Sequence, residues 1–249
     1  MEKKPTIIFE DDAFLVVNKP AGMVVNRSDT TAAVTTLQDW VEEKLKVKSQ
    51  KLKVDQSSDF YNRGGIVHRL DKETSGILII AKTPDAFVEL QRQFKERIVK
   101  KTYIALAHGK LIGEGEINVP VGRLPWNRKQ FGVVAGGRES VTKYKVLSIK
   151  YLANKNEPLS LVELYPETGR THQIRVHLKH IGHPIMSDEL YAGRKIARND
   201  RKMLPRVFLH AAKISFMHPT TKEPVEFESP LPEELQNFLR VVESSTSRK

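Results

Sequence analysis

The chain has 249 residues and no cysteine, with 39% hydrophobic and 29% charged residues, which fits a globular protein and excludes disulfides, thiol chemistry and thiolate zinc sites. No apolar run approaches the roughly 18 residues of a membrane-spanning helix, and the N-terminal residues lead directly into a strand pattern without a secretory signal. The formal net charge of +11 favours a polyanionic partner, with nucleic acid ahead of a membrane surface.

The first sixty residues predict two strands, a turn, a helix and a loop. The strands fall at residues 7–10 and 14–18, and a turn rich in proline and glycine follows at 19–22. Residues 36–46 form a helix with one apolar face, made of Leu37, Trp40, Val41 and Leu45. The polar stretch 47–62 is expected to be an exposed loop.

Residues 68–83, H-R-L-D-K-E-T-S-G-I-L-I-I-A-K-T, combine a polar segment with a short apolar run. The run at 77–81 follows turn residues and predicts a buried strand. Asp71 therefore lies on a loop just ahead of a core strand, a position where catalytic groups are common. The residues alone fit equally well a tight turn whose Asp and Ser side chains bond to nearby backbone.

The middle of the chain predicts a helix followed by a strand. Thr83 can cap this helix, with Pro84 in its first turn. The helix then places Phe87, Leu90, Phe94 and Ile98 against a sheet. Residues 101–109 form a strand that contains Tyr103, which the pattern alone favours as an ordinary strand aromatic.

The second half predicts further strands, two helices and two basic segments. Strands are expected at residues 117–121, 141–149, 159–165 and 207–216. One helix opens in the segment 168–178, has Ile174, Leu178 and Ile181 on its apolar face and ends at Gly182 and Pro184; the other spans 231–242. The basic segments are 123–138 and 194–206, and residues 244–249 are expected to be disordered.

Several long motifs resemble RluA-type RNA pseudouridine synthases over about residues 7–231. They are K-P-A-G at Lys19, H-R-L-D-K-x-T-S-G at His68, K-x-Y-x-A at Lys101, T-G-R-T-H-Q-I-R-x-H-L at Thr168, G-H-P-I at Gly182 and L-H-A at Leu209. The resemblance implies an α+β fold with a large, mainly antiparallel sheet flanked by helices and loops. It also implies one catalytic domain over 1–243, with no separate N-terminal RNA-binding domain. One departure is Ser187-Asp188 where relatives commonly read G-D, from which we expect a small local backbone change without loss of activity.

The same resemblance assigns roles to individual residues. Asp71 would be the catalytic residue, Arg175 its ion-pair partner, and Tyr103 the aromatic that stacks near the target base and could move a proton. Substrate binding is expected in the motifs at His68, Arg69, Leu70, Thr74, Arg170 and His172, and, from the cations of the segment 123–138, at Arg128 and Lys129. The expected partner is ribosomal or transfer RNA in the cytoplasm, with no membrane, obligatory protein partner, metal or cofactor, and the expected state is a monomer.

The reaction explains why these residue types are needed. Pseudouridine formation breaks the glycosidic bond and rejoins the ribose to carbon 5 of the same base, so composition is unchanged and no cofactor is required. Each route discussed for relatives needs an ionised Asp, which a neighbouring guanidinium would keep charged against a desolvating base. Flipping the base from its stack costs a few kcal/mol. Stacking on an aromatic returns part of that cost, about 1–3 kcal/mol per base.

Two other functions remain open from the sequence. A histidine-ligated metal hydrolase could draw its ligands from His172, His177, His180, His183 and Glu189, although no H-E-x-x-H motif is present. A non-catalytic RNA-binding protein would fit the charge but would not need Asp71. The segment 123–138, with Trp126 and Phe131 among its cations, is either an RNA-binding surface or a solvated hairpin whose aromatics pack on the core. The segment 194–206 is the candidate for a second RNA-binding strip.

Overall fold

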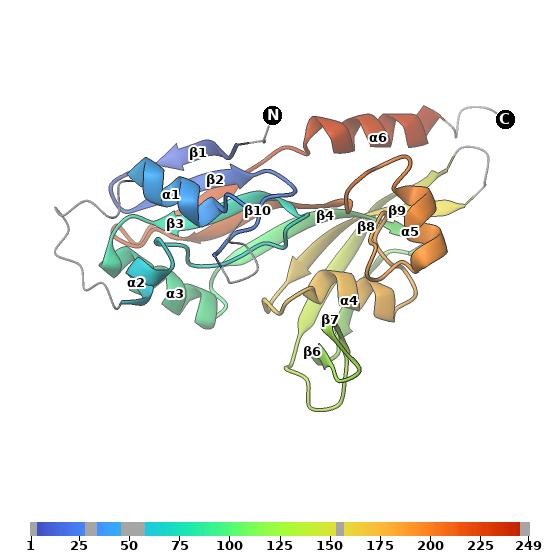
Figure 1. Cartoon of the computed structure of the whole chain (residues 1–249), viewed down its shortest axis with the longest axis horizontal. Helices are drawn as coiled ribbons and strands as arrows, with labels where there is room; N and C mark the ends of the chain where they lie inside the picture. Colours follow the sequence, from blue (N-terminus) through green and yellow to red (C-terminus); the bar gives the residue numbers. More distant parts are fainter. Residues whose placement is uncertain (1–3, 28–33, 46–57, 153–156, 245–249) are drawn as a thin grey trace. The chain divides into compact units, whose positions relative to one another are not determined.

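The computed structural model describes residues 4–27, 34–45, 58–152 and 157–244, apart from the side chains of Lys129 and residues 243–244 (Figure 1). The strands are β1 (Thr6–Glu10), β2 (Phe14–Lys19), β3 (Ser75–Ala81), β4 (Lys100–His108), β5 (Glu114–Asn118), β6 (Val121–Leu124), β7 (Asn127–Val133), β8 (Val141–Tyr151), β9 (Pro158–Pro166), β10 (Leu209–Met217) and β11 (Pro224–Glu228). The helices are α1 (Leu37–Leu45), α2 (Asp59–Asn62), α3 (Pro84–Lys95), α4 (Gln173–His180), α5 (Arg194–Asp200) and α6 (Glu233–Ser244).

Most strands join one large sheet. Its order is β1-β2-β3-β10-β4-β9-β8-β5, with β11 also on β10, while β6 and β7 form a separate two-stranded sheet. The pairs β1–β2, β2–β3, β4–β9, β8–β9, β5–β8 and β10–β11 are antiparallel. The expected α+β fold with a large, mainly antiparallel sheet is therefore confirmed.

The chain divides into two compact units. The first comprises residues 1–100 and 213–229, and the second comprises 101–212 and 230–249. Each has its own buried cluster, and the expectation of one catalytic domain over 1–243 stays a prediction. Among the residues that the structure describes, no helix is both long and apolar enough to cross a membrane.

The first unit is organised around β3, whose residues are all buried. Because this strand is covered on both faces, its sequence is a continuous apolar run without alternation. Alternate residues Ile77 and Ile79 join a cluster with Phe14, Phe87 and Leu90. The oxygen Oγ1 of Thr83 accepts from the amide of Ala86 at 3.2 Å, which confirms the predicted N-cap of α3.

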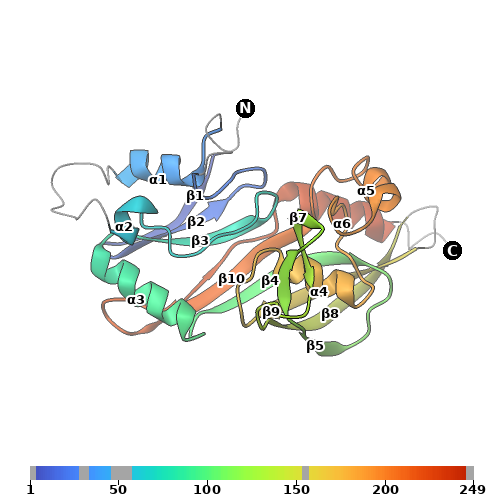
Figure 2. The same cartoon turned by 60° about the horizontal axis from the view of Figure 1, so that its bottom comes forward.

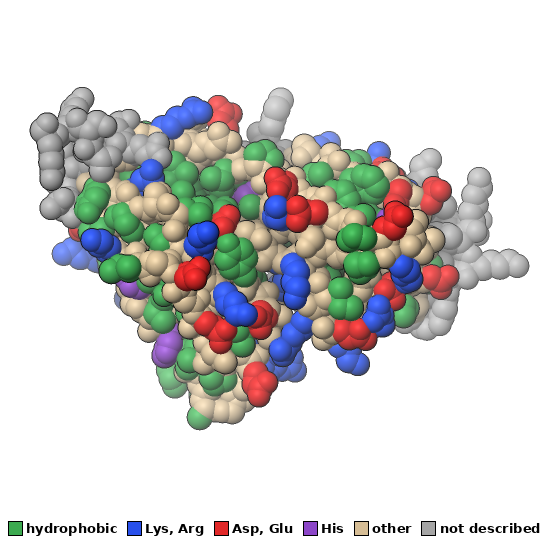
Figure 3. All heavy atoms as spheres, turned by 180° about the vertical axis from the view of Figure 1, so that it is seen from behind, with side chains coloured by type: hydrophobic (Ala, Val, Ile, Leu, Met, Phe, Trp, Pro, Cys, Tyr) green, Lys and Arg blue, Asp and Glu red, His purple; other side chains and the backbone are tan. Residues whose placement is uncertain are grey.

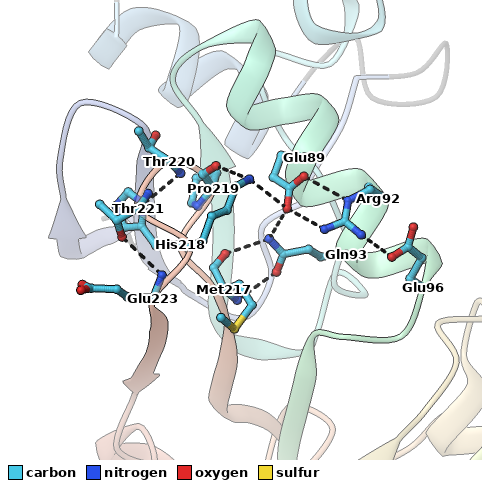
Figure 4. Close-up of polar contacts among 11 residues, drawn as sticks. Glu89, Arg92, Gln93, Glu96, Met217, His218, Pro219, Thr220, Thr221 and Glu223 are labelled. Carbon is cyan, nitrogen blue, oxygen red and sulfur yellow. Dashed lines mark hydrogen bonds and ion pairs between the residues drawn. The ribbon is translucent and has the colours of Figure 1, made fainter.

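Helix α3 is tied to the end of β10 by a side chain that imitates a backbone pair (Figure 4). Gln93 is fully buried, and its amide donates to the carbonyl of Met217 at 2.8 Å and accepts from the Met217 amide at 2.9 Å. On the same helix, Glu89 pairs with Arg92, which also pairs with Glu96. Hydrogen bonding from Arg92 lowers the pKa of Glu89 to about 2. This anchor fixes the helix that covers β3.

The second unit packs α4 and α6 residues against the strands β4, β9 and β8. Its cluster includes Leu106, Val162, Leu164, Leu178 and Phe208. The strand predicted at 101–109 is β4, and the alternating patterns at 141–149 and 159–165 correctly predicted β8 and β9. The period-2 signal is clearest in β9, where buried and half-buried residues alternate along most of the strand.

Several boundaries differ from the sequence predictions. The strand expected at 117–121 is split: β5 ends at Asn118 and β6 begins at Val121, since Pro120 offers no amide to a ladder. Helix α4 begins at Gln173, later than expected, because His172 has a φ of +56° and cannot be helical. Helix α2 and strand β11 were not predicted. Residue 46, the end of the expected helix, lies outside the described residues, as do 47–57 of the expected loop and 245–249 of the expected tail, while Ser244 ends α6.

Candidate active site

Asp71 begins a tight turn immediately before β3. The amide of Thr74 donates to the carbonyl of Asp71 at 3.1 Å, and both Thr74 and Ser75 are buried. The side chain of Asp71 is half-buried. The turn predicted from the residues is therefore present. It places Asp71 just before the N-terminal end of β3, a strand whose residues are all buried.

A buried lysine fastens this turn to the K-P-A-G turn. Lys19 is fully buried, and its Nζ donates to the carbonyls of Pro20 at 2.9 Å, Met23 at 2.9 Å and Lys72 at 3.2 Å. The amide of Gly22 also donates to the carbonyl of Lys72 at 2.8 Å. The two motifs, about fifty residues apart, are thus joined at Lys72, the residue that follows Asp71. Lys19 was not among the predicted site residues; its position in K-P-A-G was the available signal.

His68 supports the other end of the same loop. Its Nε2 accepts from the amide of Ile79 at 3.0 Å, and its ring lies 4.7 Å from that of Phe94. The preceding residues pair with β3 through backbone, since Ile66 bridges Ile80. The imidazole therefore continues that pairing in place of a carbonyl, and because Nε2 accepts, the ring proton of the neutral form is on Nδ1.

The other residues expected to bind substrate in this loop have different exposures. Arg69 is exposed and available to a phosphate, whereas Leu70 is buried, as is Thr74. The buried pair anchors the turn. Substrate contacts for His68, Arg69, Leu70 and Thr74 stay predictions.

In the second unit, Arg175 is held by a carboxylate that the sequence analysis did not assign. Its Nε donates to Oδ2 of Asp188 at 2.7 Å and its Nη2 to Oδ1 at 2.8 Å, and both side chains are buried. Asp188 also accepts from the amides of Leu190 and Tyr191, at 3.0 and 3.2 Å. An acid in the apolar context of G-H-P-I-M-S-D was the signal that a buried cation lies nearby.

The residue before this carboxylate adopts an unusual backbone conformation. Ser187, where the chain departs from the G-D of its relatives, has a φ of +65°. Glycine adopts this region without steric cost. The buried hydroxyl of Ser187 donates to the carbonyl of Leu204 at 2.8 Å, and its amide donates to Asp200 at 3.0 Å. These bonds hold the serine in the left-handed conformation.

The T-G-R-T-H-Q segment is a turn clamped by Gln173. The side-chain oxygen of Gln173 accepts from Oγ1 of Thr168 at 2.7 Å and from the amide of Arg170 at 3.0 Å. Its nitrogen donates to the carbonyl of Val141 at 3.0 Å. Arg170 is half-buried and donates to the carbonyl of Glu139, and its predicted role in substrate binding stays untested.

Tyr103 lies in β4 opposite Leu164 of β9, half-buried against the core of the second unit. Asp71 belongs to the first unit, whereas Tyr103 and Arg175 belong to the second. The pairing of Asp71 with Arg175 and the stacking role of Tyr103 therefore stay predictions.

The basic segment 123–138 is a hairpin, β6–β7, which lies beside α4 (Figures 1 and 2). Trp126, at its turn, is 79% exposed, whereas Phe131 packs with Val176 and Tyr191. Each aromatic therefore fits a different interpretation. Phe131 packs on neighbouring side chains, as expected for a structural hairpin, whereas the exposed Trp126 could stack on a base, as expected for an RNA-binding surface. Arg128 is exposed, and the side chain of Lys129 lies outside those the structure describes.

The segment 194–206 contains helix α5 and presents mainly cations. Arg194, Lys195, Arg198 and Lys202 are exposed. Asp200 is turned inward, where Oδ2 contacts Nε2 of His108 at 2.8 Å. Arg201 and Arg206 bind protein carbonyls and carboxylates. The exposed surface of this segment therefore suits an anionic partner.

The histidines of the metal hypothesis have separate partners. Nδ1 of His172 contacts the hydroxyl of Tyr191, and Nδ1 of His183 contacts the carbonyl of His108. His177 is buried between Oγ1 of Thr142 at 2.9 Å and the carbonyl of Val119 at 3.2 Å. Desolvation lowers the pKa of His177 to about 4. Within the described ranges no three His, Asp or Glu side chains are grouped as metal ligands, so the hydrolase hypothesis gains no support.

Comparison with known families identifies the class to which this fold and these motifs belong. The RNA pseudouridylate synthase family matches residues 13–180, a span that includes the Asp71 turn, β4 and α4. The chain belongs to this family, which confirms the resemblance to the RluA type.

Individual relatives cover most of the chain. It is 39% identical over 243 residues to the ribosomal large subunit pseudouridine synthase D of Neisseria meningitidis serogroup B, a match that covers 95% of this chain and 60% of that protein. It is also 39% identical over 235 residues to an uncharacterized RNA pseudouridine synthase of Bacillus subtilis, covering 94% of this chain and 71% of the relative. The chain thus spans about three fifths of the length of the Neisseria protein.

Solved structures agree with the fold. Human RNA pseudouridylate synthase domain containing 1 aligns with a TM-score of 0.71 and 30% identity, covering 94% of this chain and 87% of that structure. The human domain containing 4 aligns with a TM-score of 0.68 and 23% identity, covering 95% and 92% respectively, and supports the fold alone.

Proposed function

We propose that the chain is an RNA pseudouridine synthase in which Asp71 is the catalytic carboxylate. The observation that carries the proposal is the way the Asp71 turn is held in a member of this family: Lys19 donates to the carbonyl of Lys72 within the turn, and His68 accepts from the amide of Ile79 in the adjoining strand. Catalysis demands that the reacting group be held in a productive geometry before substrate binds. A turn held at both ends by hydrogen bonds, one of them from the fully buried Lys19, meets this demand.

The chemistry assigned to Asp71 is an isomerisation that balances without any co-reactant. The bond between the ribose anomeric carbon and N1 of uracil breaks, the base turns, and a bond forms from the same carbon to C5. The proton displaced from C5 leaves, and N1 gains one. Asp71 assists bond cleavage as an anion, by attack on the sugar or the ring or by removal of a ribose proton.

Arg175 is assigned as the cation that keeps Asp71 ionised when the base excludes water. Its Nε and Nη2 donate to Asp188, and membership of the family supports Asp71 as a second carboxylate partner of the same guanidinium. A guanidinium suits this role because it stays charged in a dry site and can bind two carboxylates through different edges. Tyr103 is assigned to stack on the flipped uracil.

We infer that the substrate is ribosomal RNA of the large subunit, with transfer RNA as the alternative. The names of the relatives support the first. On the face shown in Figure 3, cationic and anionic side chains are interspersed, so the formal charge of +11 does not form one uniform field there. Local groups such as the β6–β7 hairpin and α5 are therefore the better candidates for phosphate contacts. We expect the enzyme to act as a cytoplasmic monomer without a cofactor.

The test is Asp71→Asn, assayed by release of the C5 hydrogen from tritiated uridine in RNA. The variant preserves shape and removes the charge, so isomerisation should fall below detection while RNA affinity stays within about threefold. Asp85→Asn, on the exposed first turn of α3, is the matched control and should keep full activity. Parent-like turnover by Asp71→Asn, with deamidation excluded by mass spectrometry, would remove Asp71 from the mechanism.

The same assay separates the rival function. A parent protein that binds RNA tightly but never releases the C5 hydrogen from any ribosomal or transfer RNA would be a non-catalytic RNA-binding protein. Mapping pseudouridine in total RNA from cells with and without the gene would then identify the modified position, or show that none depends on this protein.

A further inference from the structure

The Arg175–Asp188 pair is covered by one aromatic side chain that also reaches a distant element. The ring of Tyr191 lies 5.0 Å from the guanidinium carbon of Arg175, within cation–π range. The amide of Tyr191 donates to Oδ1 of Asp188, so the same residue contacts both members of the pair. Tyr191 is buried, which strengthens each of these electrostatic contacts.

The hydroxyl of Tyr191 makes its hydrogen bonds to other residues than Arg175 and Asp188. It accepts from the backbone amide of Phe131 in β7 at 3.1 Å and shares a hydrogen bond with Nδ1 of His172 at 2.9 Å. His172 is the residue with positive φ that immediately precedes α4. One phenol therefore connects the β6–β7 hairpin to the start of the helix that carries Arg175.

The hairpin is seated on this phenol by further packing. The ring of Phe131 meets that of His172 at 5.7 Å in a T-shaped arrangement, and Phe131 packs in the same cluster as Val176 of α4. Gln130 donates to the carbonyl of Leu190 at 3.1 Å, which is a second tie to the segment around Tyr191. The outer end of the hairpin carries the exposed Trp126 and Arg128.

We propose that Tyr191 is a positioning residue that couples the seating of the β6–β7 hairpin to the orientation of Arg175. This inference rests on the proposed function for its catalytic consequence. RNA bound at the outer end of the hairpin would shift or fix the position of Phe131 in β7. The amide of Phe131 donates to the hydroxyl of Tyr191, whose ring covers Arg175 and Asp188. Hairpin docking on RNA and alignment of the guanidinium are therefore one event.

Two substitutions separate the two ends of this connection. Tyr191→Phe removes the hydroxyl and its bonds to Phe131 and His172 but leaves the ring over Arg175. Tyr191→Leu removes the ring as well. Tyr165→Phe is the matched control, because the Tyr165 hydroxyl donates to the carboxylate of Glu163 on the same strand, β9, and is not one of the groups described above.

Two readouts are needed, one of them independent of activity. Hydrogen exchange at the Phe131 amide should be about five- to tenfold faster in Tyr191→Phe, the effect of losing one hydrogen bond, and unchanged in Tyr165→Phe. In the isomerisation assay, Tyr191→Phe should raise KM for RNA about tenfold with a smaller loss in kcat. Tyr191→Leu should in addition lower kcat about 100-fold, the cost of a guanidinium misplaced by about 1 Å.

Each outcome bears on the coupling. Unchanged Phe131 exchange in Tyr191→Phe, or kinetic constants of both Tyr191 variants that match the parent, would overturn it. Equal losses of kcat in the Phe and Leu variants would also overturn it, since the ring would then have no role of its own. If the parent itself shows no isomerisation, the proposed function fails, and the exchange measurement still decides whether Tyr191 holds the hairpin.

Discussion

Replacing Lys19 by methionine should have two effects: it should lower the stability of the protein, and it should shift the position of Asp71. The ammonium is fully buried and donates to carbonyls at 2.9, 2.9 and 3.2 Å. A hydrogen bond from a charged donor contributes about 1.5–3 kcal/mol, so this set contributes roughly 5–9 kcal/mol. Desolvation of a buried ammonium costs several kcal/mol and offsets part of that. The net loss for Lys19→Met is therefore about 2–4 kcal/mol.

This loss is measurable in two ways. For a chain of this size it corresponds to a fall in Tm of roughly 5–15 °C. Because one of the acceptors is the carbonyl of Lys72, next to Asp71, kcat for isomerisation should also fall about 10- to 100-fold. Lys110→Met, at an exposed position, is the control and should change neither quantity. A Lys19→Met protein with the parent's Tm and kcat would show that these bonds neither stabilise the fold nor position the turn.

Three further predictions follow from the second unit. Since the pKa of buried His177 is about 4 when folded and 6.5 when unfolded, the unfolded state binds more protons between these values. His177 should therefore contribute about 3 kcal/mol to the fall in the free energy of unfolding between pH 6.5 and 4, and His177→Gln should remove that contribution in denaturant titrations. If the ring of Tyr103 acts by stacking on the base, Tyr103→Phe should keep most of the activity and Tyr103→Leu should lose it. A Tyr103→Phe protein that binds RNA but is inactive would assign a proton-transfer role to the hydroxyl. Arg128→Gln should flatten the slope of log affinity against log salt by about 0.7, and Trp126→Ala should cost about 1–3 kcal/mol in RNA binding without that change in slope. An unchanged slope for Arg128→Gln together with the parent's RNA affinity for Trp126→Ala would assign the hairpin to structure alone.

The parts of the fold that could be predicted are those fixed by local pattern. The apolar run after the motif gave β3, and Thr83 with Pro84 gave the start of α3, because a buried strand and a capped helix each depend on neighbours in sequence. The residue set of the Asp71 turn was likewise predictable, since the turn chemistry lies within four residues.

The parts that could not be predicted depend on partners that are distant in sequence. Nothing near Arg175 shows that Asp188 will take two of its nitrogens, and nothing near Phe131 shows that its amide will bond to Tyr191. The late start of α4 has the same origin: His172 is held in a left-handed conformation while its ring contacts Tyr191. Such contacts override local helix preference.

The hydrogen bond from Ile79 to His68 also sets a length. It closes a loop between residues eleven apart in sequence, with Asp71 inside it. Inserting one residue between His68 and Ile79 would have one of two destabilising results. Either the imidazole leaves the Ile79 amide without an acceptor, or β3 slips by one position and turns its side chains to the wrong faces. The number of residues between His68 and Ile79 is therefore fixed by strand pairing, because only this loop length allows the hydrogen bond and the correct register of β3 together.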